Sequence, residues 1–212
     1  MTFTAESKRE TPISMRRKVL LLTGEKASHR ELVRDAIDLY DDVLIFSGPV
    51  SVDFIRENKI WAIVSDRNGH ILTSEVINEL EGRAYNSHPS LLPLHRGWQP
   101  IFFSVCHNTP VGVSIHQIDS NIDCGGIVFQ SEVKLLPNDR LDTLHFRCRL
   151  EILKGWVEVW PLLRTGELKP RAQPGRGSFH SRDEFENLFM NFPMGWKTSL
   201  DDVRTKFLAL SS

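Results

Sequence analysis

The sequence predicts an α/β protein with a mostly parallel sheet flanked by helices. Short apolar runs, typical of buried strands, alternate with segments of helical periodicity, which is the pattern of a parallel sheet. The 212 residues are 41% hydrophobic and 25% charged, as in ordinary globular domains. A chain of this size buries about 70% of the surface that its unfolded form exposes, so one core forms without disulfides or a structural metal.

The first strand is predicted at residues 18–23 and ends in a turn at Gly24. Ser28 and Glu31 have the spacing of a helix capping box, and apolar residues then recur at helical spacing from Leu32 to Tyr40. Further strands and short helices are predicted to alternate after this helix: strands at 43–46, 60–64 and 83–88, and helices at 52–58 and 73–80.

Two more strands are predicted at 111–118 and 127–133, joined by an acidic, glycine-rich turn. A long helix follows, with Asn138 as its predicted N-cap and an apolar stripe from Leu141 to Leu163, and Pro161 is expected to bend or end it. Proline, glycine and basic residues then become frequent, which predicts a boundary, and two further helix starts follow at Ser181 and Ser199. The predicted organisation is a flexible N-terminal segment 1–16, a main domain 17–165 and a C-terminal extension 166–212 that could serve dimerisation.

Composition excludes several classes of function. A formal net charge of −1 argues against a protein that covers nucleic acid, and no run has the length of a membrane span or a signal peptide. Cys106, Cys124 and Cys148 lack the spacing of a zinc knuckle or a disulfide framework, which fits reduced thiols in a cytoplasmic protein. The histidines form no compact ligand motif, so no metal is expected.

Chemistry is concentrated near the end of the strand predicted at 83–88. Asn86 and His88 are two residues apart, so they face the same side at the carboxyl end of the strand, where open α/β sheets bind ligands. An amide beside an imidazole suits acyl transfer to an amine, in which an oxyanion develops and a proton leaves the nitrogen. Asp123, in the glycine-rich turn, could orient the imidazole if the fold brings the strand ends together. The alternative without catalysis is that His88 is a structural histidine and that Asn86 and Asp123 are ordinary turn residues.

A longer run of residues resembles a known family. The run Asn86-x-His88-Pro89-Ser90-Leu91-Leu92-Pro93 continues with Arg96-Gly97, Gly112-Val113-Ser114-Ile115-His116 and Asp123-x-Gly125. It is similar to the signature of formyltransferases that use N10-formyltetrahydrofolate, and the resemblance is dense over residues 60–133. It implies a Rossmann-like formyltransferase core. By resemblance, Asn86, His88 and Asp123 fall on the catalytic residues of the family.

The resemblance also implies the ligand contacts. His88 would move a proton from the attacking amine, Asn86 would stabilise the tetrahedral intermediate, and Asp123 would support the histidine. The pterin of the folate would contact main-chain atoms of two segments, namely His70, Ile71 and Leu72, and Ile118, Asp119, Ser120 and Asn121.

Among the acceptors of this family, the sequence is most similar to nucleotide-sugar N-formyltransferases. The similar segments are Val64 to Arg67, His95 to Ser104, Gly112 to Asp119 and Gly177 to His180. Substrate contacts are predicted for Asp66, Arg67, Arg96, Gly97 and Trp98, although Arg96 could instead cap a turn and Trp98 could pack against a helix. The expected acceptor is a nucleotide-linked amino-deoxysugar, with dTDP as the expected nucleotide, used for surface polysaccharides such as lipopolysaccharide O-antigen, and relatives imply a homodimer.

Other acceptors fit the sequence less well. Thr23 to Ser28 is a poor phosphate cradle for glycinamide ribonucleotide, and the C-terminal extension is short for a tRNA-binding domain. The seventeen polar residues before the first strand are too short for the regulatory domain of formyltetrahydrofolate hydrolases. A folate-binding module without turnover is a further alternative, against which the presence of Asn86, His88 and Asp123 argues.

Overall fold

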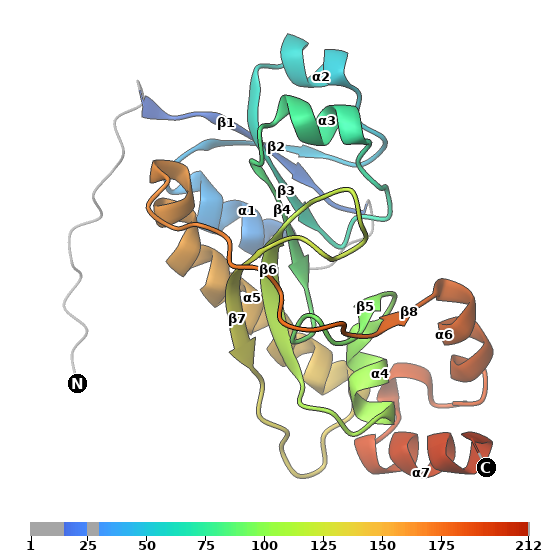
Figure 1. Ribbon diagram of the computed structural model, residues 1–212. Helices are drawn as coiled ribbons and strands as arrows, with labels where there is room; N and C mark the ends of the chain where they lie inside the picture. Colours follow the sequence, from blue (N-terminus) through green and yellow to red (C-terminus); the bar gives the residue numbers. More distant parts are fainter. Residues whose placement is uncertain (1–14, 25–29, 212) are drawn as a thin grey trace, which may run out of the picture.

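A single mixed sheet organises the protein, of which the computed structural model describes residues 15–24 and 30–211 (Figure 1). Its six strands are β1 (Lys18–Leu22), β2 (Asp42–Phe46), β3 (Ile60–Asp66), β4 (Ala84–His88), β6 (Gly112–Gln117) and β7 (Ile127–Glu132). They lie in the order β2-β1-β3-β4-β6-β7, with parallel pairing from β2 to β4 and antiparallel pairing of β6 with both neighbours. The predicted α/β class with a mostly parallel sheet is confirmed.

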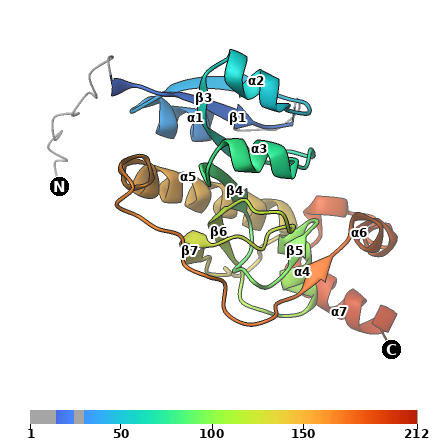
Figure 2. The same ribbon diagram turned by 45° about the horizontal axis from the view of Figure 1, so that its top comes forward.

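Helices cover both faces of the sheet (Figure 2). They are α1 (Arg30–Asp38), α2 (Val52–Glu57), α3 (Ser74–Glu79), α4 (Pro100–Cys106), α5 (Leu141–Thr165), α6 (Arg182–Phe189) and α7 (Leu200–Ser211). α1 packs beside α5 on one face, and α2 packs beside α3 on the other. Within the described residues, no helix combines the length and apolar character needed to cross a membrane.

Alternation along β1 explains the two core clusters. Val19 and Leu21 belong to the larger cluster beneath α1 and α5, whereas Leu20 and Leu22 belong to the smaller one beneath α2 and α3. All four side chains are fully buried, so β1 is covered on both faces. Such a strand is apolar at every buried position, which is why the continuous run from Val19 to Leu22 predicted it correctly.

One prediction about the long helix is wrong, and a second is narrowed. The N-cap of α5 is Arg140, whose backbone N–H donates to the Thr143 hydroxyl at 3.0 Å, and not Asn138, which has φ +63° in the turn before the helix. Pro161, predicted to bend or end the helix, does not end it, because the helix continues to Thr165 and terminates at Gly166 with φ +77°, and the bend stays a prediction. The predicted helix start at Ser28 lies outside the described residues.

The C-terminal extension is folded and packs on the main domain. Its first part, orange in Figure 1, runs from the end of α5 past β7 to β8 (Phe179–His180), which pairs with β5 (Arg96–Gly97). Ser181 and Ser199 accept hydrogen bonds from the first turns of α6 and α7, as predicted. Phe185 and Phe192 from this region belong to the larger core cluster. The extension therefore shares its core with the main domain.

The three cysteines are free thiols, as predicted. Cys106 and Cys148 are buried, and burial raises the pKa of each thiol to about 12, so neither is a thiolate near neutral pH. Cys124 is half-buried. In the part of the chain that the structure describes, no group of three or more histidine, cysteine or acidic side chains is arranged to hold a metal ion.

Candidate active site

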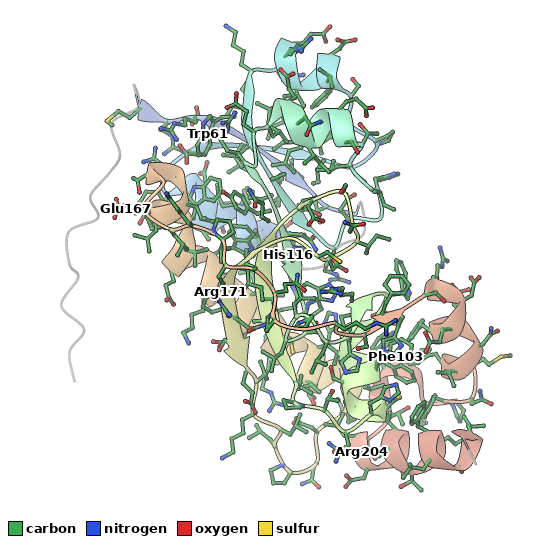
Figure 3. All side chains as sticks on the ribbon, in the orientation of Figure 1. Trp61, Phe103, His116, Glu167, Arg171 and Arg204 are labelled. Atoms are coloured by element: carbon green, nitrogen blue, oxygen red, sulfur yellow. The ribbon has the colours of Figure 1, made fainter. Side chains whose placement is uncertain are left out.

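The carboxyl end of β4 carries two polar side chains on one face of the sheet. Asn86 is half-buried and His88 is buried. Ser87, between them, points to the other face, where its hydroxyl accepts a hydrogen bond from the Trp156 indole at 2.8 Å. His116 lies opposite Asn86 on the antiparallel neighbour β6 (Figure 3). β4 and β6 therefore bring an amide and two imidazoles to one place.

Asp123 lies at the centre of this group. Its Oδ1 is 3.3 Å from Asn86 Nδ2 and 3.4 Å from His116 Nε2. Its Oδ2 accepts a hydrogen bond from the Gly97 N–H at 2.9 Å and lies 3.4 Å from His88 Nδ1. The structure thus brings together Asn86, His88 and Asp123, which come from two separate parts of the sequence.

The backbone around this carboxylate has an unusual conformation. Asp123 has φ +52°, a left-handed conformation that aspartate tolerates better than most residues. Gly97 has φ +89°, and a Cβ there would overlap the carbonyl oxygen of His180. Because only glycine fits at position 97, its N–H can approach the Asp123 carboxylate.

Electrostatics make Asp123 the charged member of the pair with His88. Burial alone raises the pKa of Asp123, but the neighbouring His88, His116 and Gly97 N–H outweigh it and hold the pKa well below its usual range. Burial lowers the pKa of His88, and the Asp123 charge opposes this shift without reversing it. Near neutral pH the pair therefore consists of a carboxylate beside a mostly neutral imidazole that is ready to accept a proton.

Hydrogen bonds define which imidazole nitrogens are free. His88 Nε2 lies 2.9 Å from the carbonyl oxygen of His95, and since a carbonyl only accepts, Nε2 carries a proton. A second proton can therefore bind only at Nδ1, which faces Asp123. His116 Nδ1 is 2.8 Å from the carbonyl oxygen of Gln117, which leaves His116 Nε2 to accept from Asn86 Nδ2 at 3.2 Å.

A buried histidine cluster supports the carbonyl that holds His88. His95 Nδ1 is 3.0 Å from His180 Nε2, and His180 Nδ1 is 2.9 Å from a carboxylate oxygen of Glu184. His95 Nε2 is 2.7 Å from the Thr109 hydroxyl. Phe103, labelled in Figure 3, stacks on His180 with ring centroids 3.7 Å apart. Because Glu184 fixes the tautomer of His180, the chain is satisfied when Thr109 donates to His95 and His95 donates to His180.

Two of the predicted substrate residues lie on either side of the end of β3. Asp66 is buried and forms a bidentate ion pair with Arg149 of α5 at 2.6 and 2.8 Å, an arrangement that joins helix to sheet. Arg67 has φ +56° and lines a small cavity of about 20 Å³, together with Arg149 and His145. Burial, followed by the charge of Arg149, lowers the pKa of Arg67. The predicted substrate contacts of Asp66 and Arg67 stay predictions.

The other predicted substrate residues lie beside the C-terminal extension. The Arg96 guanidinium donates to Gln173 Oε1 at 2.7 and 3.2 Å, to the Asp123 carbonyl at 3.2 Å and to the Arg176 carbonyl at 3.0 Å. Because these contacts use the donors of Arg96 within the protein, they favour the turn-capping alternative over a site that binds phosphate. Trp98 is 37% exposed and packs against the Arg182 guanidinium, 5.4 Å from its ring centroid. The indole is therefore accessible to a ligand.

The two segments predicted to bind folate meet at the smaller core cluster. Leu72 is buried in that cluster, and Ile118 packs against it. Ile71 is 78% exposed and His70 is also exposed. The residues that follow Ile118 are exposed as well, namely Asp119, Ser120 and Asn121. Both segments thus contain exposed residues beside the face that carries Asn86, and their contact with folate stays a prediction.

Two residues of this site were not assigned by the sequence. The alternation of polar and apolar residues on β6 places His116 toward the site, but gave it no role. Gln173 was missed because it lies in the stretch whose proline, glycine and basic residues predicted only a boundary. Its amide donates to the carbonyls of Asp123 and Gly125 at 2.7 and 2.8 Å.

Comparison with known proteins supports the chemistry of the site. Residues 52–159 match the formyl transferase family. The chain belongs to this family. The match includes Asn86, His88, His116 and Asp123, and it confirms the resemblance inferred from the sequence. Members of this formyl transferase family use formyltetrahydrofolate as the donor.

Individual relatives differ in how much of the chain they share. The formyltransferase PseJ from Anoxybacillus kamchatkensis, crystallised with UDP-4,6-dideoxy-4-formamido-L-AltNAc and tetrahydrofolate, is 31% identical with a TM-score of 0.79. That similarity covers 90% of this chain and 99% of PseJ. Methionyl-tRNA formyltransferase from Thermotoga neapolitana is 33% identical over 73% of this chain. Cytosolic 10-formyltetrahydrofolate dehydrogenase from Pongo abelii is 35% identical over 49% of this chain. This formyl transferase chain spans 50% of the former and 12% of the latter.

Proposed function

We propose that the protein transfers the formyl group of N10-formyltetrahydrofolate to the amine of a nucleotide-linked amino-deoxysugar. The observation that carries this proposal is the similarity to PseJ, which extends over 90% of this chain and 99% of that one at 31% identity. The sugar bound in that complex is a UDP-linked formamido sugar. A UDP-linked acceptor is therefore as well supported as the dTDP-linked acceptor expected from the sequence.

In the proposed reaction, His88 accepts the proton that the attacking amine loses. The amine nitrogen bonds to the formyl carbon, and His88 takes up the proton at Nδ1, since Nε2 already donates to the His95 carbonyl. Asp123 Oδ2, 3.4 Å from this nitrogen, stabilises the imidazolium. When the bond from the formyl carbon to N10 breaks, the proton passes to N10 and tetrahydrofolate leaves. A neutral imidazole with a lowered pKa suits the first of these steps.

Asn86 is proposed to stabilise the oxyanion of the tetrahedral intermediate. Its Nδ2 donates to His116 Nε2 and to Asp123 Oδ1, at 3.2 and 3.3 Å. Both contacts are long, so an oxyanion at shorter hydrogen-bond distance would replace one of them. The other contact then keeps the amide in the orientation that donation requires.

The remaining sequence predictions assign the two ligands to their binding residues. We propose that the folate pterin contacts the backbone of residues 70–72 and 118–121, which are largely exposed. We propose that Trp98 and Arg67 contact the nucleotide sugar, since an accessible indole can stack on a sugar or base. The cavity beside Arg67, about 20 Å³, has room for a water molecule and not for a diphosphate, so the proposal for Arg67 rests on the resemblance to sugar N-formyltransferases.

We further propose that the protein acts as a cytoplasmic homodimer and that its product enters surface polysaccharide. Exposed apolar side chains on the C-terminal extension support self-association, among them Met190, Met194 and Leu208. Sedimentation equilibrium of the purified chain tests this part, and a monomer at micromolar concentration contradicts it.

The decisive experiment is mass spectrometry of acceptors incubated with the protein and N10-formyltetrahydrofolate. The panel contains UDP- and dTDP-linked amino sugars, glycinamide ribonucleotide and methionyl-tRNA, with His88→Gln as the matched inactive variant. A gain of one formyl group on an amino sugar, absent with the variant, supports the proposal. Methionyl-tRNA belongs in the panel because a methionyl-tRNA formyltransferase is among the relatives.

Other outcomes would assign a different function. Formylation of glycinamide ribonucleotide or methionyl-tRNA in preference to every sugar would replace the acceptor class and keep the reaction. Folate binding without formylation of any amine in the panel would support the non-catalytic module.

A further inference from the structure

The C-terminal extension inserts one side chain into the loop that carries Asp123. Between residues 171 and 177, Gln173 is half-buried and the other six residues are exposed. Its register is fixed by backbone hydrogen bonds between Arg171 and Ile127, at 2.8 and 2.9 Å, at the start of β7 (Figure 3 labels Arg171). Residues two apart on an extended chain face the same side, so this pairing directs Gln173 toward the loop.

The amide of Gln173 is fully used in one orientation. Its two N–H groups donate to the Asp123 and Gly125 carbonyls, at 2.7 and 2.8 Å. Its oxygen accepts two bonds from the Arg96 guanidinium, at 2.7 and 3.2 Å. The opposite orientation would direct the amide oxygen at two carbonyl oxygens and its N–H groups at a cation, so neighbouring groups dictate this one.

The loop segment from Asp123 to Gly125, which Gln173 bonds, has a backbone conformation that needs such support. Asp123 has φ +52°, which is disfavoured for a residue with a side chain, and the contacts to its carbonyl compensate for that conformation. Gly125 has no space for a side chain, because a Cβ there would overlap the Gln117 carbonyl. The position of the Asp123 carboxylate relative to His88 is thus set partly by an amide about fifty residues further along the chain.

We propose that Gln173 is a positioning residue for formyl transfer, which holds the Asp123 carboxylate at His88 Nδ1. The proposal rests on the proposed function, because it assigns Asp123 its part in the reaction. Gln173 itself donates only to loop carbonyls and accepts only from Arg96. Its effect is therefore indirect.

Two substitutions and one control test this role. Gln173→Met keeps the length of the side chain and removes both donors and the acceptor. Gln173→Glu keeps the partner of Arg96 but turns a carboxylate toward the Asp123 and Gly125 carbonyls. Lys169→Met places the same new residue at an exposed position of the same segment.

We expect both Gln173 variants to lower kcat at least tenfold, with changes of less than threefold in KM for either substrate. A displacement of about 1 Å in a catalytic group can lower a rate about a hundredfold. Lys169→Met should keep the wild-type kcat. Unchanged kcat in the Gln173 variants, or a rise in KM for the folate with kcat intact, would overturn the positioning role.

A second measurement does not depend on turnover. The His88 imidazole is titrated by NMR in the wild type and in each folded variant. Retreat of the Asp123 charge leaves burial less opposed, so we expect the pKa of His88 to fall in Gln173→Met, which adds no charge of its own, and to stay unchanged in Lys169→Met. An unshifted His88 would overturn the proposal even where kcat falls. A shifted His88 in a protein that formylates no amine would instead keep the structural claim and reject the proposed function.

Discussion

Low pH should lower the stability of the fold through His95, whose buried ring bonds to His180 and Thr109 next to the site. His95 is 3% exposed, and burial, followed by the charges of His180, His107 and His88, lowers its pKa to about 4. In the unfolded chain a histidine has a pKa of about 6.5. As the pH falls below 6.5, His95 therefore binds a proton in the unfolded chain but stays neutral in the folded protein.

The sign and size of the effect follow from these two values. The stabilising contribution of neutral His95 is fully present above pH 6.5 and is lost as the pH falls from 6.5 toward 4. Between pH 7 and pH 5, His95 alone lowers the free energy of unfolding by about 2 kcal/mol. For a chain of this size, that corresponds to a decrease in Tm of about 4–8 °C.

Urea unfolding at pH 7 and pH 5 measures the effect, with His95→Gln as the test variant. Glutamine can still pair with the Thr109 hydroxyl but does not titrate, so we expect this variant to lose about 2 kcal/mol less than the wild type over the interval. Titratable groups that do not interact with His95 contribute equally to both proteins and cancel. His70→Gln, at an exposed histidine, should behave as the wild type does. If His95→Gln loses as much stability as the wild type, the assignment to His95 is refuted.

Three further substitutions test separate contacts. Asp66→Asn leaves the buried Arg149 guanidinium without its charged partner and should lower the free energy of unfolding by about 3–5 kcal/mol in urea, whereas a loss under 1 kcal/mol would contradict the ion pair's importance. Gly97→Ala forces a Cβ against the His180 carbonyl at φ +89°, so we expect at least a tenfold lower kcat in the formylation assay, and wild-type kcat would argue against the close approach. Asn86→Ala should lower kcat by about a hundred- to a thousandfold with little change in Tm, and a kcat within tenfold of wild type would exclude oxyanion stabilisation.

The sequence could predict those parts of the fold and site that depend on local periodicity. Strand alternation placed Asn86 and His88 on one face of β4 and directed His116 toward the same place. The helix starts at Ser181 and Ser199 were readable because capping requires only a short side-chain contact within one turn. These features depend on residues a few positions apart, where backbone geometry leaves few choices.

Other features depend on tertiary contacts that no local pattern encodes. Asn138 has the composition of an N-cap, but the turn before α5 takes it to φ +63° and the helix begins after Arg140. β5 and β8 have two residues each, too few for a periodic signal. Their pairing nevertheless brings His180 to His95. The resemblance to a family identified Asp123, while Gln173, which holds its loop, had no local signal of any kind.

These nonlocal contacts converge on one carboxylate, and that convergence predicts that the site depends on the C-terminal extension. Asp123 Oδ2 accepts from Gly97 N–H, in a strand that exists only because β8 pairs with it. The Asp123 carbonyl accepts from Gln173, and His88 donates to the carbonyl of His95, whose ring bonds to His180. The extension thus acts on both members of the Asp123–His88 pair. Its removal would leave β4 and β6 with their side chains but without the contacts that set the distance between acid and base.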